Sequence, residues 1–156
     1  MVTIQSVSLS DTTEILDIMI RSFENYRHTL FPESSVFRET EDSLRGKLES
    51  GGGFFAAMEG QNVGFVSYEI RDSYVYLGRL SVLPEYRGLG IGKALINAVE
   101  SVAVNHQLHQ VRLNVRIALE NNHRLFESLG FKKIAWHKHE GFTEPTYIEM
   151  SKDLLG

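Results

Sequence analysis

The sequence has 156 residues, of which 42% are hydrophobic, and this size and composition fit one globular domain, residues 1–156, with a sizeable core. It contains no cysteine, which excludes disulfides, thiolate zinc sites and cysteine nucleophiles together. The formal net charge of -4 argues against a partner with a nucleic-acid backbone, because proteins that bind one carry a concentrated basic face.

The amino-terminal residues and the hydropathy pattern predict a cytoplasmic protein. Met1 to Gln5 lacks the basic and then apolar pattern of a signal peptide. No apolar run approaches the roughly 20 residues that span a bilayer. We therefore expect neither a membrane nor a nucleic acid as a partner.

The first third of the chain predicts one strand and two helices. A strand near Thr3 to Ser8 leads to Asp11-Thr12-Thr13-Glu14, where an N-cap residue with an acid three residues later favours a helix start. A second helix is expected from Glu39 to Leu48. Apolar side chains recur at helical spacing in the first helix and after it: Ile15, Leu16, Met19, Phe23 and Tyr26.

Three antiparallel strands are expected next. Gly51 to Gly53 predicts a loop, because clustered glycines usually interrupt regular structure. Gly60-Gln61-Asn62 predicts a hairpin turn between the strands Phe54–Met58 and Val63–Ile70. A third strand follows from Tyr74 to Leu83.

The third of these strands changes phase in its middle. Val75 and Leu77 occupy odd positions, whereas Leu80 and Val82 occupy even ones, so the apolar face slips by one residue at Gly78-Arg79. Strict alternation forbids this slip unless an extra residue is accommodated, and a β-bulge beside a glycine is the usual solution. The bulge predicts unpaired backbone groups near Leu80 to Val82 that are free to bind an extended, amide-bearing ligand such as pantetheine.

A glycine-rich turn, Arg87-Gly88-Leu89-Gly90-Ile91-Gly92-Lys93, precedes an amphipathic helix expected from Gly90 to Asn105. Its alternate glycines allow the backbone to approach a ligand, and the helix start offers unpaired N–H groups and a partial positive charge. An anion, most simply a phosphate, fits this turn. Arg87 and Lys93 would add positive charge at its rim.

The last third of the chain predicts a strand, a short helix and two strands. Gln110 to Ile117 alternates cleanly between apolar and polar residues. A short helix is expected from Asn121 to Leu129, followed by strands around Lys132–His139 and Thr146–Lys152. Trp136 is predicted to lie in the core.

Two well-known phosphate loops do not fit the glycine-rich turn. The dinucleotide fingerprint requires Gly-x-Gly-x-x-Gly, whereas Gly88, Gly90 and Gly92 are evenly spaced. A P-loop requires glycine at the position of Arg87 and serine or threonine at the position of Ala94. A nucleotide or dinucleotide enzyme is therefore a distant alternative.

The segment from Leu80 to Gly92 resembles the signature of the GCN5-related N-acetyltransferase (GNAT) superfamily, in which Arg87, Gly90 and Gly92 occupy the characteristic positions. Leu125 to Phe131 is similar to a later Leu-Tyr-x-x-x-Gly-Phe segment of that family. The resemblance implies an α/β (α+β mixed) GNAT fold, with a mostly antiparallel sheet of about seven strands, bulged and splayed at the fourth, and about four helices.

The resemblance also implies the ligand and the residues that hold it. The cofactor would be acetyl-CoA as acyl donor, with no metal, and a homodimer is one arrangement found in such folds. The backbone of the glycine-rich turn would hold the pyrophosphate, and the bulged strand would bind pantetheine. The cofactor-binding residues expected on this basis are Leu80, Ser81, Val82, Arg87, Gly88, Leu89, Gly90, Ile91, Gly92, Lys93 and Asn122.

The sequence departs from the family pattern at two positions. The tyrosine thought to protonate the departing thiolate is replaced by Phe126, and the usual asparagine seven residues earlier by Leu119. Asn121 and Asn122 either substitute for that asparagine or cap the short helix. His123 is either an alternative proton donor or a surface residue. A thiolate with a pKa near about 8.5 is a fair leaving group without a donor.

The expected catalytic residues are acids and a tyrosine close to the bulge. Glu69 and Glu149 are candidate bases, because an attacking amine must first lose a proton. Tyr76 is expected to line the acceptor cleft together with Tyr74. His137 and His139 lie on one face of a strand, but without a third ligand they favour the acceptor-site rim or plain surface over a metal site. Aromatic and cationic residues after the first helix are candidates to recognise a carboxylate or a ring on the acceptor: Tyr26, Arg27, His28, Phe31 and Pro32.

The function that follows from the resemblance is transfer of an acetyl group from acetyl-CoA to a primary amine, on a small molecule or a peptide. Attack would be direct, within a ternary complex, because no cysteine is present to carry an acyl-enzyme thioester. The alternative is a catalytically weak acyl-CoA-binding module that regulates a partner.

Overall fold

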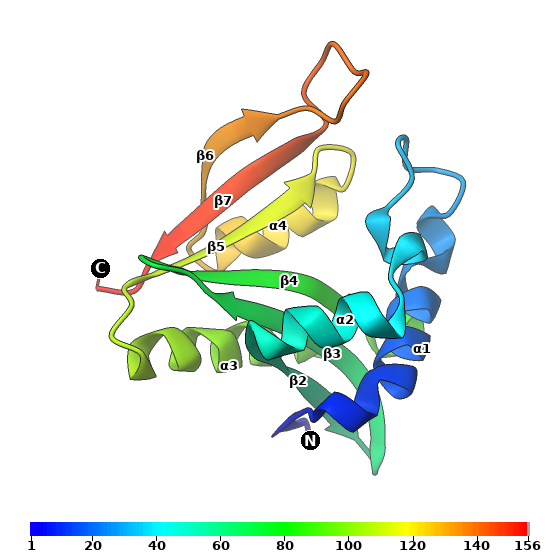
Figure 1. The fold of residues 1–156 in the computed structure, drawn as a ribbon, viewed down its shortest axis with the longest axis vertical. Coiled ribbons are helices and arrows are strands. Elements are labelled where there is room, and N and C mark those ends of the chain that lie inside the picture. Colours follow the sequence, from blue (N-terminus) through cyan, green and yellow to red (C-terminus); the bar gives the residue numbers. More distant parts are fainter. Residues whose placement is uncertain (156) are drawn as a thin grey trace.

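A seven-stranded sheet of order β1-β2-β3-β4-β5-β7-β6 forms the centre of the computed structural model, which describes residues 1–155 (Figure 1). Neighbouring strands are antiparallel except β4 and β5, which run parallel. The strands are β1 (Thr3–Ser6), β2 (Gly51–Met58), β3 (Gln61–Ile70), β4 (Val75–Val82), β5 (Gln110–Arg116), β6 (Lys132–His137) and β7 (Tyr147–Asp153). The helices are α1 (Thr12–Phe23), α2 (Glu41–Glu49), α3 (Ile91–Asn105) and α4 (Glu120–Ser128), with short 3-10 turns that include η3 (Ser35–Arg38) and η4 (Pro84–Tyr86).

This order of elements confirms the mixed, mostly antiparallel α/β fold expected from the sequence. The parallel pair β4–β5 requires a crossover, which α3 supplies. The assignment of residues 1–156 to one domain stays a prediction. Among residues 1–155, no helix combines the length and the apolar character that a bilayer crossing needs.

The helices cover both faces of the sheet. Helices α1 and α2 lie in front of β2 to β4 in Figure 1, and α3 passes behind them. On the α3 side, a Cβ placed on Gly64 of β3 would lie 3.0 Å from the side chain of Ile91 and 3.2 Å from that of Leu95. Glycine at this position therefore allows α3 to pack closely on the sheet. The buried residues with the largest side chains are Phe65, Phe131, Ile15, Ile18, Met19, Leu44, Ile91, Leu95, Ile96, Leu113, Met150 and Val36.

The predicted bulge in β4 is confirmed. The register between β3 and β4 shifts between Phe65 and Ser67, because two residues of β4, Arg79 and Leu80, stand opposite one residue of β3. Arg79 has a φ of 52°, a left-handed conformation that is uncommon for a residue with a side chain. The bulge therefore bends β4 at the position that the change of phase indicated.

The prediction of a loop at Gly51 to Gly53 is wrong. These glycines form the first part of β2 and pair with β3. A Cβ on Gly51 would lie only 2.1 Å from the carbonyl oxygen of Tyr68, so the close approach of the two strands requires glycine there. Trp136 was also expected in the core, but it is 55% exposed because β6 is an edge strand.

The first predicted helix start is confirmed, and the second is displaced. Helix α1 begins at Thr12, and Asp11 occupies its N-cap position. The carboxylate of Asp11 does not cap α1; it turns back and accepts a hydrogen bond of 2.8 Å from the backbone N–H of Ser8. Helix α2 begins at Glu41 instead of Glu39, because the side chain of Thr40 accepts a hydrogen bond from the N–H of Ser43 and caps the first turn.

Candidate functional site

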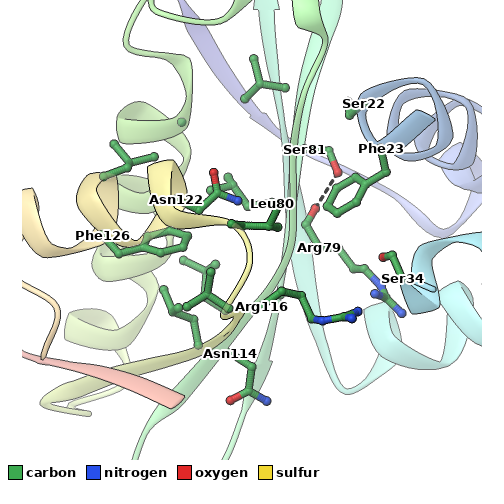
Figure 2. Close-up of a pocket in the computed structure, with 18 of the residues that line it drawn as sticks. Ser22, Phe23, Ser34, Arg79, Leu80, Ser81, Asn114, Arg116, Asn122 and Phe126 are labelled. Carbon is green, nitrogen blue, oxygen red and sulfur yellow. Dashed lines mark hydrogen bonds between the residues drawn. The ribbon is translucent and has the colours of Figure 1, made fainter. Parts of the chain in front are cut away.

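A cleft of about 830 Å³ opens where β4 and β5 diverge. The two parallel strands pair only at Val75 and Tyr76 of β4, so the remainder of β4 has no neighbour on that side. Figure 2 shows that the cleft extends to both sides of β4: Asn122 and Phe126 lie on the side of α4, and Ser34 and Phe23 lie on the other side. The splayed strands thus leave a passage through the sheet.

The free edge of β4 presents backbone groups to this passage. The N–H of Leu83 donates to the carbonyl oxygen of Val63 on β3. Because successive residues of a strand point their backbone groups to opposite edges, the N–H groups of Leu80 and Val82 point away from β3 and toward the cleft. Both residues line the cleft, as does the buried Ser81, whose hydroxyl donates to the carbonyl oxygen of Arg79. An extended ligand can therefore bind to β4 as an added strand does.

The glycine-rich turn lines part of the cleft through Gly88, Gly90 and Gly92. Gly88 has a φ of 79° and Gly90 a φ of 82°, and a Cβ built on either would meet no atom within 4 Å. Gly90 precedes α3 without any side-chain cap, so the N–H groups of the first helical turn, Ile91 to Lys93, have no intrahelical partners. This combination of open space, free donors and the positive end of a helix fits a phosphate group.

Arg87 was expected to add positive charge at the rim of the turn, but its side chain is engaged by backbone carbonyl oxygens. Its guanidinium donates to the carbonyl oxygens of Val82, at 3.2 Å, and Ser22, at 2.7 Å, so it joins the end of α1 to the end of β4. Lys93 is exposed and lines the cleft, and Leu89 is 54% exposed and lies outside the lining. Arg87 and Lys93 both line the cleft, but the guanidinium of Arg87 already donates to protein carbonyl oxygens.

Helix α4 contributes Asn122 and Phe126 to the cleft (Figure 2). Neither asparagine caps α4, because the N-cap position is Leu119; Asn121 accepts a hydrogen bond from Arg124 instead. His123 is neither a surface residue nor part of the cleft lining: it is buried, and its Nε2 lies 2.8 Å from the carbonyl oxygen of Arg116.

The three predicted catalytic residues occupy different places. Tyr76 lines the cleft, and burial raises the pKa of its phenol above the usual value, so it is neutral near pH 7. Glu69, opposite Tyr76 on β3, forms an ion pair with Arg71 and does not line the cleft. Glu149 also lies outside the lining, beside Arg112 and His137.

The expected acceptor-binding group after α1 is only partly at the cleft. Tyr26 lines it, but Arg27 forms an ion pair with Glu24 and lies over the ring of Phe37 instead. Phe31 is 86% exposed and contacts Phe142 edge to face.

Cations that sequence reasoning missed line this part of the cleft. They are contributed by η3, the β4 bulge, the end of β5 and the segment after β6. The chain segments that carry them are far apart in the sequence, so no local pattern brings them together. These residues are Arg38, Arg79, Arg116 and Lys138.

The buried carboxylate of Glu39 stabilises the bulge of β4 through hydrogen bonds. The side chain of Glu39 is 1% exposed, and its carboxylate accepts hydrogen bonds from Arg79 Nε at 2.9 Å, from Lys47 Nζ at 2.8 Å, and from Ser43. Arg79 also donates to the hydroxyl of Ser35 at 2.8 Å. Burial alone would raise the pKa of Glu39, but the hydrogen bonds from Lys47 and Ser43 and the charge of Arg79 outweigh it, so the pKa is lowered. This network fixes the left-handed residue of β4.

His139, which the sequence placed at the acceptor-site rim or on the plain surface, lines the cleft beside these cations. Burial, followed by the positive charges of Arg116 and Arg38, lowers the pKa of its imidazole, so it is neutral near pH 7. Within residues 1–155, no three histidine, aspartate or glutamate side chains come close enough together to hold a metal ion.

Residues 12–131 match the model of the acetyltransferase (GNAT) family, and the chain therefore belongs to that family. Over 92 residues, or 58% of the chain, it is 37% identical to an N-acetylaspartate synthetase of Danio rerio, and the match spans only 32% of that protein's length. It is also 27% identical to an N-alpha-acetyltransferase of Sulfurisphaera tokodaii over 87% of the chain and 83% of that protein.

Solved structures share the whole fold. The ribosomal-protein-S18-alanine N-acetyltransferase of Escherichia coli superposes with a TM-score of 0.80 at 22% identity, over 99% of this chain and 94% of that one. The PaiA N-acetyltransferase of Thermoplasma acidophilum, in complex with coenzyme A, superposes with a TM-score of 0.79 at 20% identity, over 98% and 99% of the two chains. At these identities the likeness establishes the architecture alone.

Proposed function

We propose that this protein transfers the acetyl group of acetyl-CoA to a primary amine by direct attack in a ternary complex. One observation carries the proposal: the free edge of β4 and the open glycine-rich turn lie in the same cleft. Coenzyme A is a long molecule with amides in its pantetheine arm and a diphosphate beyond them. The cleft offers backbone N–H groups for both parts, in the order in which the molecule presents them.

We propose that the pantetheine arm lies along Leu80 to Val82 and that the diphosphate binds the N–H groups of Gly88 to Lys93. Asn122 lies across the cleft from β4 and would contact the same arm. The N–H groups of Leu80 and Val82 would also bind the carbonyl oxygen of the acetyl group as it becomes an oxyanion. No metal is needed for this chemistry, because backbone dipoles stabilise the developing charge.

The names of the relatives support nitrogen as the acceptor atom. One is a synthetase of N-acetylaspartate and the other an N-alpha-acetyltransferase. A single cleft that crosses the sheet admits the donor from the α3 side and an acceptor from the α1 side, which a ternary complex requires. The amine nitrogen would form a bond to the thioester carbon, lose its proton and expel the CoA thiolate.

We propose Tyr76 as the residue of the predicted catalytic set that meets the acceptor, because it alone lines the cleft. The base roles of Glu69 and Glu149 stay predictions. Phe126 lies in the cleft without a proton to donate, and we propose that the thiolate departs unassisted or takes a proton from water.

The experiment that tests the function is release of free thiol from acetyl-CoA in the presence of a panel of amines. We expect thiol release to depend on the amine. Because both substrates must bind before either product leaves, double-reciprocal plots of initial velocity at several amine concentrations should intersect. Parallel plots would contradict direct attack. Tight binding of CoA without release for any amine would instead support a regulatory module.

A further inference from the structure

The acceptor side of the cleft is strongly cationic. Four of its lining side chains are basic, namely Arg38, Arg79, Arg116 and Lys138, whereas Glu140 is the one acidic side chain that lines it in the described part of the chain. Figure 2 shows that the guanidinium groups of Arg79 and Arg116 lie on the same side of β4 as Ser34, away from Asn122 and Phe126. The charges of Arg79 and Arg116 are therefore separated by β4 from Asn122, which we assign to the pantetheine arm.

Most of these charges have no acidic partner. Over residues 1–155, no carboxylate forms an ion pair with Arg38, Arg116 or Lys138. The guanidinium of Arg116 donates only to a carbonyl oxygen, that of Pro32 at 2.5 Å, and burial lowers its pKa. Arg38 and Lys138 are exposed, whereas Arg116 is half-buried. A partly buried charge without a counterion is costly, so a bound anion would relieve that cost for Arg116.

Arg79 is fixed by the protein but not neutralised. Glu39 carries one negative charge and is shared between Arg79 and Lys47, so the group of three keeps a net positive charge. Glu39 and Ser35 engage Nε and Nη1 of Arg79. Within the described residues, no hydrogen bond engages the remaining nitrogen, Nη2, and these two partners already hold the side chain in place.

We propose that the acceptor is a small amino acid, whose amine attacks the thioester while its carboxylate is held by Arg79, Arg116 and Arg38. This proposal rests on the acetyl transfer proposed above. A planar guanidinium matches a carboxylate in a bidentate way. The same charges repel ammonium groups, so they disfavour polyamines and lysine side chains, and they help the acceptor amine to lose its proton.

The loops around this end of the cleft are joined to one another. The segment after α1 and the segment after β6 meet through the rings of Phe31 and Phe142, whose centroids are 6.0 Å apart. The hydrogen bond from Arg116 to Pro32 ties the first of these segments to the end of β5. These contacts connect the two loops and the end of β5 beside the site. A peptide has no free carboxylate on its amino-terminal α-carbon, so a site for that group favours a free amino acid.

The test compares kcat/KM, from thiol release, for each proteinogenic amino acid and for its carboxamide, which differs only in the lost charge. We expect the best amino acid to exceed its amide by about 100-fold, because a site built for a charged, bidentate group rejects an analogue that lacks it. Spermidine and a short peptide should be poor acceptors.

Variants of the cationic side chains test which residues bind the carboxylate. Arg116→Gln and Arg38→Gln should each reduce the preference for acid over amide by about tenfold and leave the Kd for CoA unchanged, which also reports that the variants fold. Arg27→Gln is the matched control, since Arg27 lies in the segment between α1 and η3 but outside the cleft lining, and it should leave the preference for acid over amide unchanged.

The proposed carboxylate site would be overturned if amides, spermidine or peptides were acetylated with the same kcat/KM as amino acids. That result would leave the proposed acetyl transfer intact. No thiol release with any acceptor, together with no CoA binding, would overturn the proposed function itself.

Discussion

Replacing Gly92 with aspartate should abolish CoA binding without unfolding the protein. Gly92 is in the first turn of α3 and lines the cleft, and a Cβ there would meet only Leu125, at 3.7 Å, an ordinary contact. An acidic side chain is favourable at a helix start. It would, however, repel the diphosphate with about 4 kcal/mol for unit charges 4 Å apart near a surface. We therefore expect CoA binding, measured by calorimetry, to weaken about 100-fold or more.

Gly92→Ala is the control for this change. It adds the same Cβ without the charge. The alanine variant should retain CoA binding, and the melting temperatures of both variants should equal or exceed that of the wild type. An aspartate variant that binds CoA with wild-type affinity would refute the phosphate assignment.

Replacing Glu39 with glutamine should destabilise the protein by about 3 kcal/mol near neutral pH, the size of effect expected when one partner of a buried ion pair is removed. The carboxylate has its pKa lowered in the folded state, so its contribution to stability is fully present above its unfolded value of 4.5. That contribution is lost as the pH falls through the lower, folded value. The difference in the free energy of unfolding between wild type and variant should therefore narrow below pH 4.5.

The measurement is denaturant unfolding of both proteins from pH 7 to pH 3. Glu49→Gln serves as the control, because Glu49 lies at the end of the adjacent helix α2, is exposed and forms no ion pair in the described part of the chain. It should change stability little at any pH. If the difference in the free energy of unfolding between wild type and Glu39→Gln stays constant below pH 4.5, the ionised carboxylate is not the source of the stability.

The cofactor end of the site could be predicted because its signals are local in the sequence. The change of phase in β4 required an extra residue, and the structure places Arg79 there with a φ of 52°. The spacing of Gly88, Gly90 and Gly92 before an amphipathic stretch indicated an open helix start, which the structure confirms. Strand alternation and helix periodicity likewise predicted the order of the elements.

The cations of the proposed acceptor end could not be predicted because they come from distant segments. Arg38, Arg79 and Arg116 belong to a 3-10 turn, a bulge and a strand end, and tertiary packing alone brings them to one cleft. The sequence offered a group of residues after the first helix for acceptor recognition, of which Tyr26 lines the cleft, whereas a local ion pair with Glu24 holds Arg27 elsewhere. A sequence pattern does not show which ion pair a side chain forms in the folded protein, so it could not predict that Arg27 points elsewhere.

A structure of the complex with coenzyme A is the most direct test of the central claim, that one cleft joins a free strand edge to an open helix start. We expect the diphosphate within hydrogen-bond distance of the N–H groups from Gly88 to Lys93, and the pantetheine amides paired with the backbone of Leu80 and Val82. Coenzyme A bound elsewhere, with β4 and the start of α3 untouched, would contradict the assignment.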